Sequence, residues 1–307
     1  MALIVEKSVK EQLKNTYLWR YMSLPKFLDL INTQEMYFAN NKQLVDSDPY
    51  EGRLPIFTDL LLALIKQINF HKQAHPDLPD YIMNVDSKKI EKIHKTLEEI
   101  KENTFINCWH INNDENYLMW QSYAKEKGGV AIVTDIYSLI EAFETDIEIQ
   151  AIPVIYDTNK ISKDKLETYS NVVNDKFDIK ILKNIIWESS LYKKEFFKNE
   201  NELRLIFQKS INNRVKVNLN KLIKHIYISP NSTECEKKII TDTINILKLK
   251  GEVNIDVEKI IHNSLISRTY VKNTSNILEE NLSKNYLTSE EIQKIKNLIK
   301  YTPPHKS

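Results

Sequence analysis

The sequence is poor in glycine and cysteine, and each shortage excludes a class of protein. Its 307 residues include only 4 Gly, so neither a GxGxxG nor a GxxxxGK[ST] phosphate-binding loop can be written from it. The 2 cysteines, Cys108 and Cys235, are far apart and have no CxxC spacing. This excludes a disulfide framework and argues against a cysteine zinc site. A Rossmann enzyme, a P-loop NTPase and a disulfide-rich secreted domain are therefore not expected.

An excess of charge and a long apolar run are missing as well. Lys+Arg 43 against Asp+Glu 42 leaves a formal net charge of +1, so no global charge favours nucleic acid or a membrane surface. The longest strongly apolar stretch, residues 60–65, is far shorter than the roughly 20 residues of a membrane span. The apolar run at the N-terminus is too short for a signal peptide. We therefore expect a cytoplasmic protein that makes no membrane contact.

Short strand patterns and helical patterns mix without strict alternation, which predicts an α+β fold. We expect one domain over residues 1–307 with a small mixed or antiparallel sheet. Its core covers about 17–230, a helical insertion covers about 57–103, and a C-terminal extension with helices covers 231–307. The predicted strands lie at residues 17–21, 36–39, 105–109, 130–134, 152–156, 202–207, 215–219, 226–229 and 253–257.

The segment Glu200-x-Glu202-x-Arg204 is the most informative candidate site. In a strand, Glu202 and Arg204 share one face while Leu203 and Leu205 share the other. One interpretation is an ion pair along the strand, which is worth about 0–1 kcal/mol if it is exposed. The other is a carboxylate that an arginine holds in a cleft, ready to bind a sugar hydroxyl or to stabilise positive charge. A carboxylate beside an arginine stays ionised, which suits charge stabilisation better than acid catalysis.

Other features leave two interpretations open or exclude a site. Arginine in this lysine-rich chain reflects either codon bias or a need for bidentate contact with carboxylate or phosphate. His71 and His75 lack the Glu between them that an HExxH zinc helix has, so no metal site is predicted. The polar loop 48–51 either caps a helix or serves a site. Trp120 and Tyr123, three apart on a predicted helix, either pack in the core or line a pocket.

A series of short motifs lies in a fixed order between about residues 17 and 230. In this order the motifs resemble the bacterial and phage family called domain of unknown function 2971. The Met-Trp-x-x-Tyr-Ala and Glu-x-Glu-x-Arg motifs are the most specific, whereas Ser47 and Trp109-His110 depart from the family pattern. The motifs occupy residues 18–21, 36–40, 48–52, 107–109, 118–124, 128–132, 154–157, 192–194 and 200–206.

The same order is similar to that of the ADP-ribosyltransferase superfamily. That fold has a His or Arg on its first strand, an aromatic residue on a middle strand and a late Glu, often in Glu-x-Glu. The resemblance gives these roles to Arg20, to Tyr37 or Phe38, and to Glu202. It implies NAD as the substrate and a macromolecule, protein or nucleic acid, as the acceptor of ADP-ribose. Such an enzyme would act as a toxin or a phage-conflict effector.

The residue types suit this chemistry. Breaking the nicotinamide–ribose bond builds an oxocarbenium-like cation, which a nearby carboxylate stabilises. An aromatic ring can stack on nicotinamide, and an arginine can bind the pyrophosphate without a glycine loop. The resemblance thus implies Glu202, Arg20 and Tyr37 as catalytic residues. The cofactor-binding candidates are Arg20, Tyr21, Tyr37, Phe38, Asn40, Trp120, Tyr123 and Arg204.

Two other functions stay open. One is a catalytically inert module that binds a nucleotide or a partner protein through the same cleft. The other is a nuclease or nucleic-acid-binding protein, against which the balanced charge and the missing metal cluster argue. The enzyme hypothesis requires that the strands of Arg20, Tyr37 and Glu202 lie in one sheet, or in two sheets that face one cleft. The acceptor and the oligomeric state are not predicted.

Overall fold

The computed structural model describes residues 2–45, 87–124, 128–156, 179–209, 212–249 and 260–264. A mixed, mostly antiparallel sheet of nine strands forms its centre, in the order β1-β7-β8-β5-β2-β6-β10-β11, with β4 paired to β5 off this path. The strands are β1 (Leu3–Val5), β2 (Tyr17–Met22), β4 (Ala39–Asn40), β5 (Thr104–Ile111), β6 (Val130–Asp135), β7 (Ile149–Pro153), β8 (Glu202–Gln208), β10 (His225–Ile228) and β11 (Ile261–Asn263). A second sheet pairs β3 (Glu35–Tyr37) with β9 (Arg214–Lys216). The predicted α+β class is confirmed.

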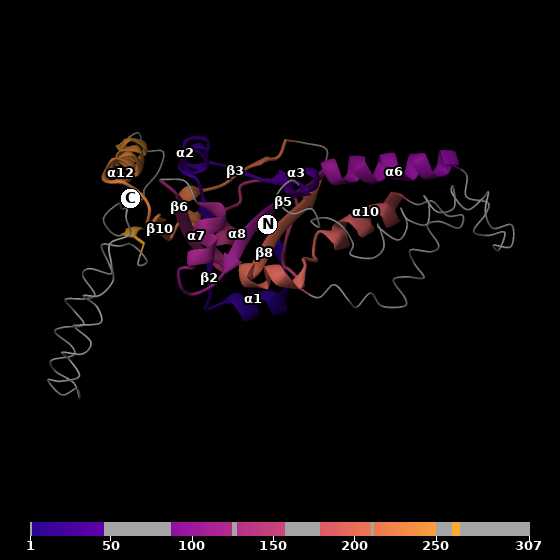
Figure 1. Cartoon of the computed structure of the whole chain (residues 1–307), viewed down its shortest axis with the longest axis horizontal. Helices are drawn as coiled ribbons and strands as arrows, with labels where there is room; N and C mark the ends of the chain where they lie inside the picture. Colours follow the sequence, from indigo (N-terminus) through magenta and orange to yellow (C-terminus); the bar gives the residue numbers. More distant parts are fainter. Residues whose placement is uncertain are drawn as a thin grey trace, which may run out of the picture.

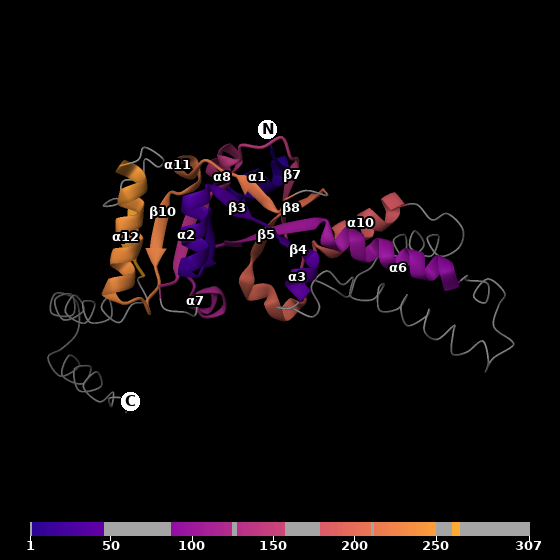
Figure 2. The same cartoon turned by 90° about the horizontal axis from the view of Figure 1, so that it is seen from above.

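Helices pack around the sheet and extend beyond it (Figure 1). In Figure 2, α12 lies beside α2 at the β10 end, and α6 lies beside α10 at the other end. Part of the predicted insertion at 57–103 is thus the helix α6, while its residues up to 86 lie outside the described ranges. The helices are α1 (Lys7–Leu13), α2 (Leu24–Thr33), α3 (Asn41–Val45), α6 (Ser87–Glu102), α7 (Tyr117–Tyr123), α8 (Ile136–Ala142), α10 (Ile179–Ser189), α11 (Leu219–Leu222) and α12 (Glu234–Leu249), with a 3-10 helix η1 (Glu195–Glu200).

The two faces of the central strands are chemically different. Leu203 and Leu205 of β8 and Trp109 of β5 belong to the main apolar core, which α2 helps to cover. Directly opposed residues of antiparallel strands share a face. Cys108 therefore shares its face with Arg204, its partner in register. The alternation predicted for 202–207 is confirmed, although both faces of this strand are buried.

One edge of β5 is covered by two different strands, and the sheet splits between them. The opposite edge pairs with β8 from Thr104 to His110. On the split edge, β4 pairs with Phe105 and Ile106, and β2 pairs with His110 and Ile111. Neither β2 nor β4 pairs with residues 107–109. After Trp19, β2 leaves β5 and continues beside β6 alone.

Predicted and observed element boundaries differ at several places. The strand predicted at 152–156 runs from Ile149 to Pro153, and it is an interior strand between β1 and β8. Pro153 is tolerated at the last position of β7 because β1 pairs only with residues 149–151. No carbonyl of β1 therefore lies where the N–H that proline lacks would be needed. The predicted helix that carries Trp120 and Tyr123 begins after Asn116, whose side chain accepts two backbone N–H groups.

Several other predictions lie outside the described residues. They concern the loop at 48–51, His71 and His75, the strand at 253–257 and the last helix of the chain. None of the helices in the described ranges combines the length and the apolar character that crossing a bilayer requires.

Candidate functional site

A cleft of about 740 Å³ opens at the split in the sheet. Its walls come from β2, β3, β5 and β8, from the helices α2 and α7, and from the segment around η1. Arg20, Tyr37 and Glu202 all line it. Arg20 and Glu202 belong to the nine-stranded sheet, whereas Tyr37 belongs to the two-stranded one. The expectation that these strands would face one cleft is therefore confirmed.

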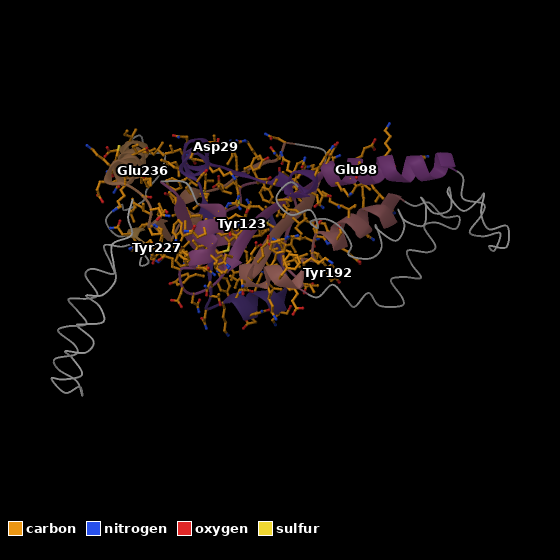
Figure 3. The ribbon with its side chains drawn as sticks, viewed as in Figure 1. Asp29, Glu98, Tyr123, Tyr192, Tyr227 and Glu236 are labelled. Atoms are coloured by element: carbon orange, nitrogen blue, oxygen red, sulfur yellow. The ribbon has the colours of Figure 1, made fainter. Side chains whose placement is uncertain are left out.

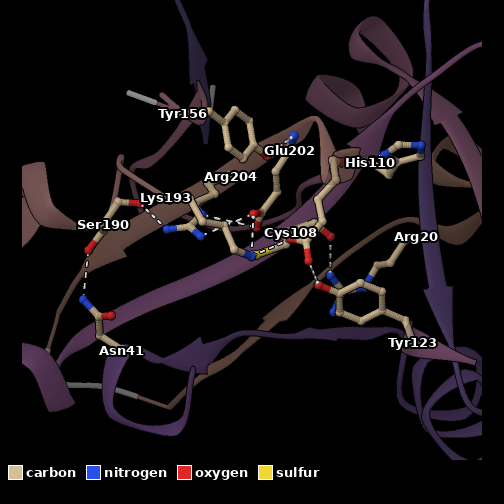
Figure 4. A network of polar contacts seen from close by, with 11 residues as sticks. Arg20, Asn41, Cys108, His110, Tyr123, Tyr156, Ser190, Lys193, Glu202 and Arg204 are labelled. Atoms are coloured by element: carbon tan, nitrogen blue, oxygen red, sulfur yellow. Dashed lines mark hydrogen bonds and ion pairs between the residues drawn. The ribbon is translucent and has the colours of Figure 1, made fainter. Parts of the chain in front are cut away.

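Glu202 lies in a buried cluster of charges on the cleft wall (Figure 4). Its Oε1 accepts a hydrogen bond from Arg204 Nε at 3.2 Å, and its Oε2 accepts one from Arg204 Nη2 at 3.3 Å. Lys193 Nζ lies 3.5 Å from the same Oε2. Burial alone would raise the pKa of Glu202. Arg204, Lys193 and a hydrogen bond with Cys108 outweigh burial and lower that pKa to about 2, so the carboxylate is ionised throughout the physiological range.

The segment around Ser190, which follows α10, fixes the position of the Arg204 guanidinium. Arg204 Nη1 donates to the backbone oxygen of Ser190 at 2.5 Å. The Ser190 hydroxyl accepts a bond of 2.9 Å from Asn41 Nδ2, which ties the end of α10 to the start of α3. Figure 4 shows the line of polar contacts from Asn41 through Arg204 to Glu202. A buried network of this kind makes the orientation of the Glu202 carboxylate a property of the fold.

Glu200 is the more exposed carboxylate of the Glu-x-Glu motif. Its side chain is 18% exposed, against 6% for Glu202. Lys193 Nζ donates to Glu200 Oε2 at 2.5 Å, and the Tyr123 hydroxyl donates to Oε1 at 3.1 Å. Asn201, between the two acids, has a positive φ of 36° and ends η1. This left-handed turn changes the chain direction, so one lysine ammonium contacts both carboxylates.

A buried histidine stands between the carboxylates and α7. His110 Nδ1 lies 2.5 Å from the backbone oxygen of Glu200, which can only accept, so this nitrogen carries the proton. Its Nε2 is then the acceptor for the side-chain amide of Asn116 at 3.4 Å. Asn116 also caps α7, and its backbone N–H donates to the Tyr21 hydroxyl. Burial lowers the pKa of His110, which keeps the ring neutral and the connection between β5 and α7 intact.

Arg20 reaches the cleft from the opposite face of the sheet. Trp19 pairs with His110, and His110 pairs with Glu202, so these three share a face and Arg20 projects from the other. Its Nη1 donates to the backbone oxygen of Cys108 at 3.0 Å, within the stretch of β5 that the split leaves beside the cleft. Burial lowers the pKa of Arg20 below its usual value. The split therefore lets a cation from one face and a carboxylate from the other line the same space.

The aromatic candidates divide between the cleft and the interior. Tyr37 lines the cleft, where its ring lies 5.8 Å from the guanidinium of Arg214 and its hydroxyl donates to Gln43. Phe38 is fully buried against Phe207 in the main core, and it is not among the residues that line the cleft.

Three further candidates have structural contacts. Asn40 lies beside the cleft rather than in its wall, and its Oδ1 accepts the backbone N–H of Gln43 at the start of α3. Tyr21 lines the cleft, and its ring packs edge-on against Trp120. Arg204 lines the cleft, but its guanidinium donates hydrogen bonds to Glu202 and to the backbone oxygen of Ser190.

Trp120 and Tyr123 take different roles. Trp120 is 1% exposed, packs in a second apolar cluster with Trp19, and donates its indole N–H to Glu115. Tyr123 lines the cleft near the middle of the molecule (Figure 3). Its desolvation, and then the charge of Glu200, raise the pKa of Tyr123, so the hydroxyl keeps the proton that it donates. The core interpretation is thus confirmed for Trp120 only.

Sequence reasoning missed Lys193, His110 and Cys108 as members of the site, and it gave Glu200 no role of its own although the Glu-x-Glu motif contains it. The motif at 192–194 was the signal for Lys193, and the first acid of Glu-x-Glu was the signal for Glu200. The motif at 107–109 includes Cys108 but gave it no role, and no local pattern indicated His110, because the place of both residues depends on the register of β5 with β8.

Comparison with known families identifies part of this site. A family described as Protein of unknown function (DUF2971) matches residues 119–205. This stretch contains both motifs that are the most specific for the family, the one starting at Met119 and the one ending at Arg204. The resemblance to the family is therefore confirmed over these residues, which supply Tyr123, Lys193 and both carboxylates of the cleft. No curated protein and no protein of solved structure matches the chain.

Proposed function

We propose that the cleft binds NAD and that the protein is an ADP-ribosyltransferase-like enzyme with a macromolecular acceptor. The observation that carries this proposal is the convergence of Arg20, Tyr37 and the Glu200–Glu202 pair on one cleft. A volume of about 740 Å³ suits a ligand of nucleotide or dinucleotide size. The split edge of β5 offers a binding surface that needs no glycine-rich loop.

The proposed roles follow the contacts. Arg20 would bind the pyrophosphate, because among the described residues its guanidinium donates to the backbone oxygen of Cys108 and pairs with no carboxylate. Tyr37 provides an aromatic face. Glu200 is the carboxylate that faces the ribose, since it is the more exposed of the two acids. Glu202 positions Lys193, which in turn holds Glu200.

The reaction would break the bond between C1′ of the ribose and the nicotinamide nitrogen. Nicotinamide leaves with the bonding electron pair, and positive charge builds on C1′ and the ring oxygen. The Glu200 carboxylate stabilises that charge. A nucleophile of the acceptor then forms a bond to C1′ and loses its proton, which completes the transfer of ADP-ribose.

A second candidate is a binding module without turnover. The specific observation in its favour is that Lys193 Nζ, at 2.5 Å from Glu200 Oε2, already neutralises the carboxylate that would face the ribose. A neutralised carboxylate contributes less to the stabilisation of a cation in the cleft than a lone one would.

One experiment separates the two candidates. NAD affinity is measured by calorimetry, and nicotinamide release is measured on the same samples with and without a cell extract as the source of acceptor. The enzyme is supported by release that needs the wild-type Glu200. Saturable NAD binding with no release in any extract supports the binding module, and absence of both contradicts the two together.

A further inference from the structure

Two buried side chains of the cleft carry polar atoms that the fold leaves unsatisfied. Asn107 and Trp109 of β5 line the cleft and are each about 1% exposed. Within the described residues, neither Asn107 Oδ1 nor Trp109 Nε1 has a hydrogen-bond partner. Native proteins contain few such atoms, because each one costs the desolvation of a polar group without return.

The orientation of the Asn107 amide is set by its other end. Asn107 Nδ2 donates to the backbone oxygen of Tyr37 at 2.8 Å, which joins β5 to β3. A flipped amide would place its oxygen against that carbonyl, so Oδ1 is the end that remains unsatisfied. The indole Nε1–H of Trp109 is a donor only. The two atoms therefore form one acceptor and one donor.

The alternation of β5 puts these two side chains on the same face of the strand. Asn107 and Trp109 are two residues apart and project from the same face of β5, the face from which Arg20 also projects. The other unsatisfied atoms in the described ranges belong to Asn41 and Ser232, which do not line the cleft. The cleft thus has an acceptor and a donor, both uncharged, in the same wall as its arginine.

We infer that Asn107 and Trp109 form a subsite for an uncharged, planar group that carries an N–H donor next to an acceptor. The ligand's N–H would donate to Asn107 Oδ1, and its acceptor would receive the Trp109 indole N–H. A carboxylate or a phosphate fails here because it has no N–H for Asn107. The inference rests on the proposed function in one respect, that the cleft holds a nucleotide. Such a molecule offers this group in two places, the nicotinamide carboxamide and the amino edge of adenine.

Pairs of probes that differ only in the N–H donor test this subsite. Nicotinamide is compared with 3-acetylpyridine, in which a methyl group replaces the amino group, and adenosine is compared with purine riboside, which lacks the 6-amino group. Affinities are measured by ligand-observed NMR titration. In one of the two pairs, the wild type should bind the amino compound about 10-fold more tightly, because its partner leaves Asn107 Oδ1 buried without a donor. The pair that shows the preference identifies which end of the nucleotide the subsite takes.

Variants assign the preference to the two residues. Asn107→Leu should reduce the ratio within that pair to about one. Trp109→Phe should weaken the binding of both probes of that pair equally, because both retain the acceptor for the indole N–H. The affinity ratio within the pair should therefore stay at the wild-type value. Ser232→Ala is the matched control, because Ser232 also carries a buried, unsatisfied polar atom, its Oγ, but lies outside the cleft wall; it should keep the wild-type ratio. Thermal unfolding confirms that each variant is folded, and an unfolded Asn107→Leu is replaced by Asn107→Thr, which also removes the amide oxygen.

The results for the subsite and for the proposed function can differ. Equal affinities within both pairs, no binding of any probe, or a ratio that persists in Asn107→Leu would overturn the subsite, whatever NAD does. A clear preference together with no nicotinamide release from NAD would leave the subsite standing and contradict the enzyme. The NAD titration of the wild type, run beside the probes, makes this distinction.

Discussion

At the scale of single residues, the buried charges set most of the properties of the site. Glu202 contacts both Arg204 and Lys193, and all three side chains are less than a tenth exposed. A buried ion pair contributes little compared with an apolar replacement, but removing one partner leaves the other charge uncompensated. The structural importance of Glu202 is therefore separate from any role in catalysis.

Glu202→Gln should lower the free energy of unfolding by about 3–5 kcal/mol, because it leaves the Arg204 guanidinium buried without its anion. Urea unfolding of the variant and the wild type measures this. Glu11→Gln is the matched control, since the Glu11–Lys14 pair is exposed at 60% and 50%; its effect should stay within about 0.5 kcal/mol. A Glu202 variant as stable as the control would show that the cluster relaxes around the missing charge.

Glu200→Gln should have the opposite profile. Because Glu200 is more exposed, the variant should lose less stability than Glu202→Gln, while nicotinamide release should fall by about 10²–10³, the cost of removing one strong electrostatic stabiliser. NAD affinity should change little, since the ground-state ribose is neutral. Turnover and unfolding measured on the same preparation check this. Full turnover in Glu200→Gln would remove Glu200 from the chemistry.

At the scale of elements, the alternation of apolar and polar residues predicted β8 and the faces of Glu202 and Arg204. It did not predict that the polar face would be buried, since alternation is typical of strands with one solvated face. The cover comes from the chain around Ser190 and Lys193, whose contact with β8 the alternation within the strand does not indicate. Lys193 could not be placed for the same reason: its contacts with Glu200 and Glu202 depend on the left-handed turn at Asn201.

The junction between α7 and β6 depends on Gly129. A Cβ at this position would lie 2.6 Å from Ala124 Cβ and 2.9 Å from the Ala124 oxygen, closer than real contacts allow. Gly129→Ala should therefore displace the end of α7, which carries Tyr123, and lower the free energy of unfolding by about 1–3 kcal/mol. Thermal or urea unfolding measures the loss.

Adding Ala124→Gly to Gly129→Ala should restore part of that stability. The second change removes the Cβ contact but leaves the contact with the Ala124 oxygen. If the double variant is less stable than Gly129→Ala alone by the full cost of a new glycine, the clash is not the cause of the loss.

At the scale of the whole molecule, the two histidines His225 and His110 make the free energy of unfolding depend on pH. His225 Nδ1 lies 3.1 Å from His262 Nε2, at the β10 end of the sheet that Tyr227 marks in Figure 3. Burial, and then His262 and Lys224, lower the pKa of His225, and burial lowers that of His110. Around His225 the described groups also include Tyr17, Tyr227 and Asp135, which pairs with Lys224.

The sign of the pH effect follows from these directions. Both histidines bind protons less readily in the folded than in the unfolded protein, so unfolding takes up protons at mildly acidic pH. The free energy of unfolding should be greatest above about pH 6.5 and should fall as the pH drops below that value. Urea midpoints between pH 7.5 and 5.5 measure this. His225→Gln should flatten the dependence, and an unchanged slope would exclude His225 as a source.

The split beside β5 also has a mechanical consequence. Two residue pairs join β2 to β5, whereas seven join β5 to β8. The nine strands therefore form two groups, one on the β5 side and one on the β2 side, that are joined by little backbone pairing. Resistance to sliding between these two groups depends on side-chain packing more than on backbone pairing. Arg20 belongs to the group on the β2 side and Glu202 to the group on the β5 side. A ligand that contacts both residues would connect the two groups of strands where few backbone pairs join them. It would reduce their relative motion more than its size suggests.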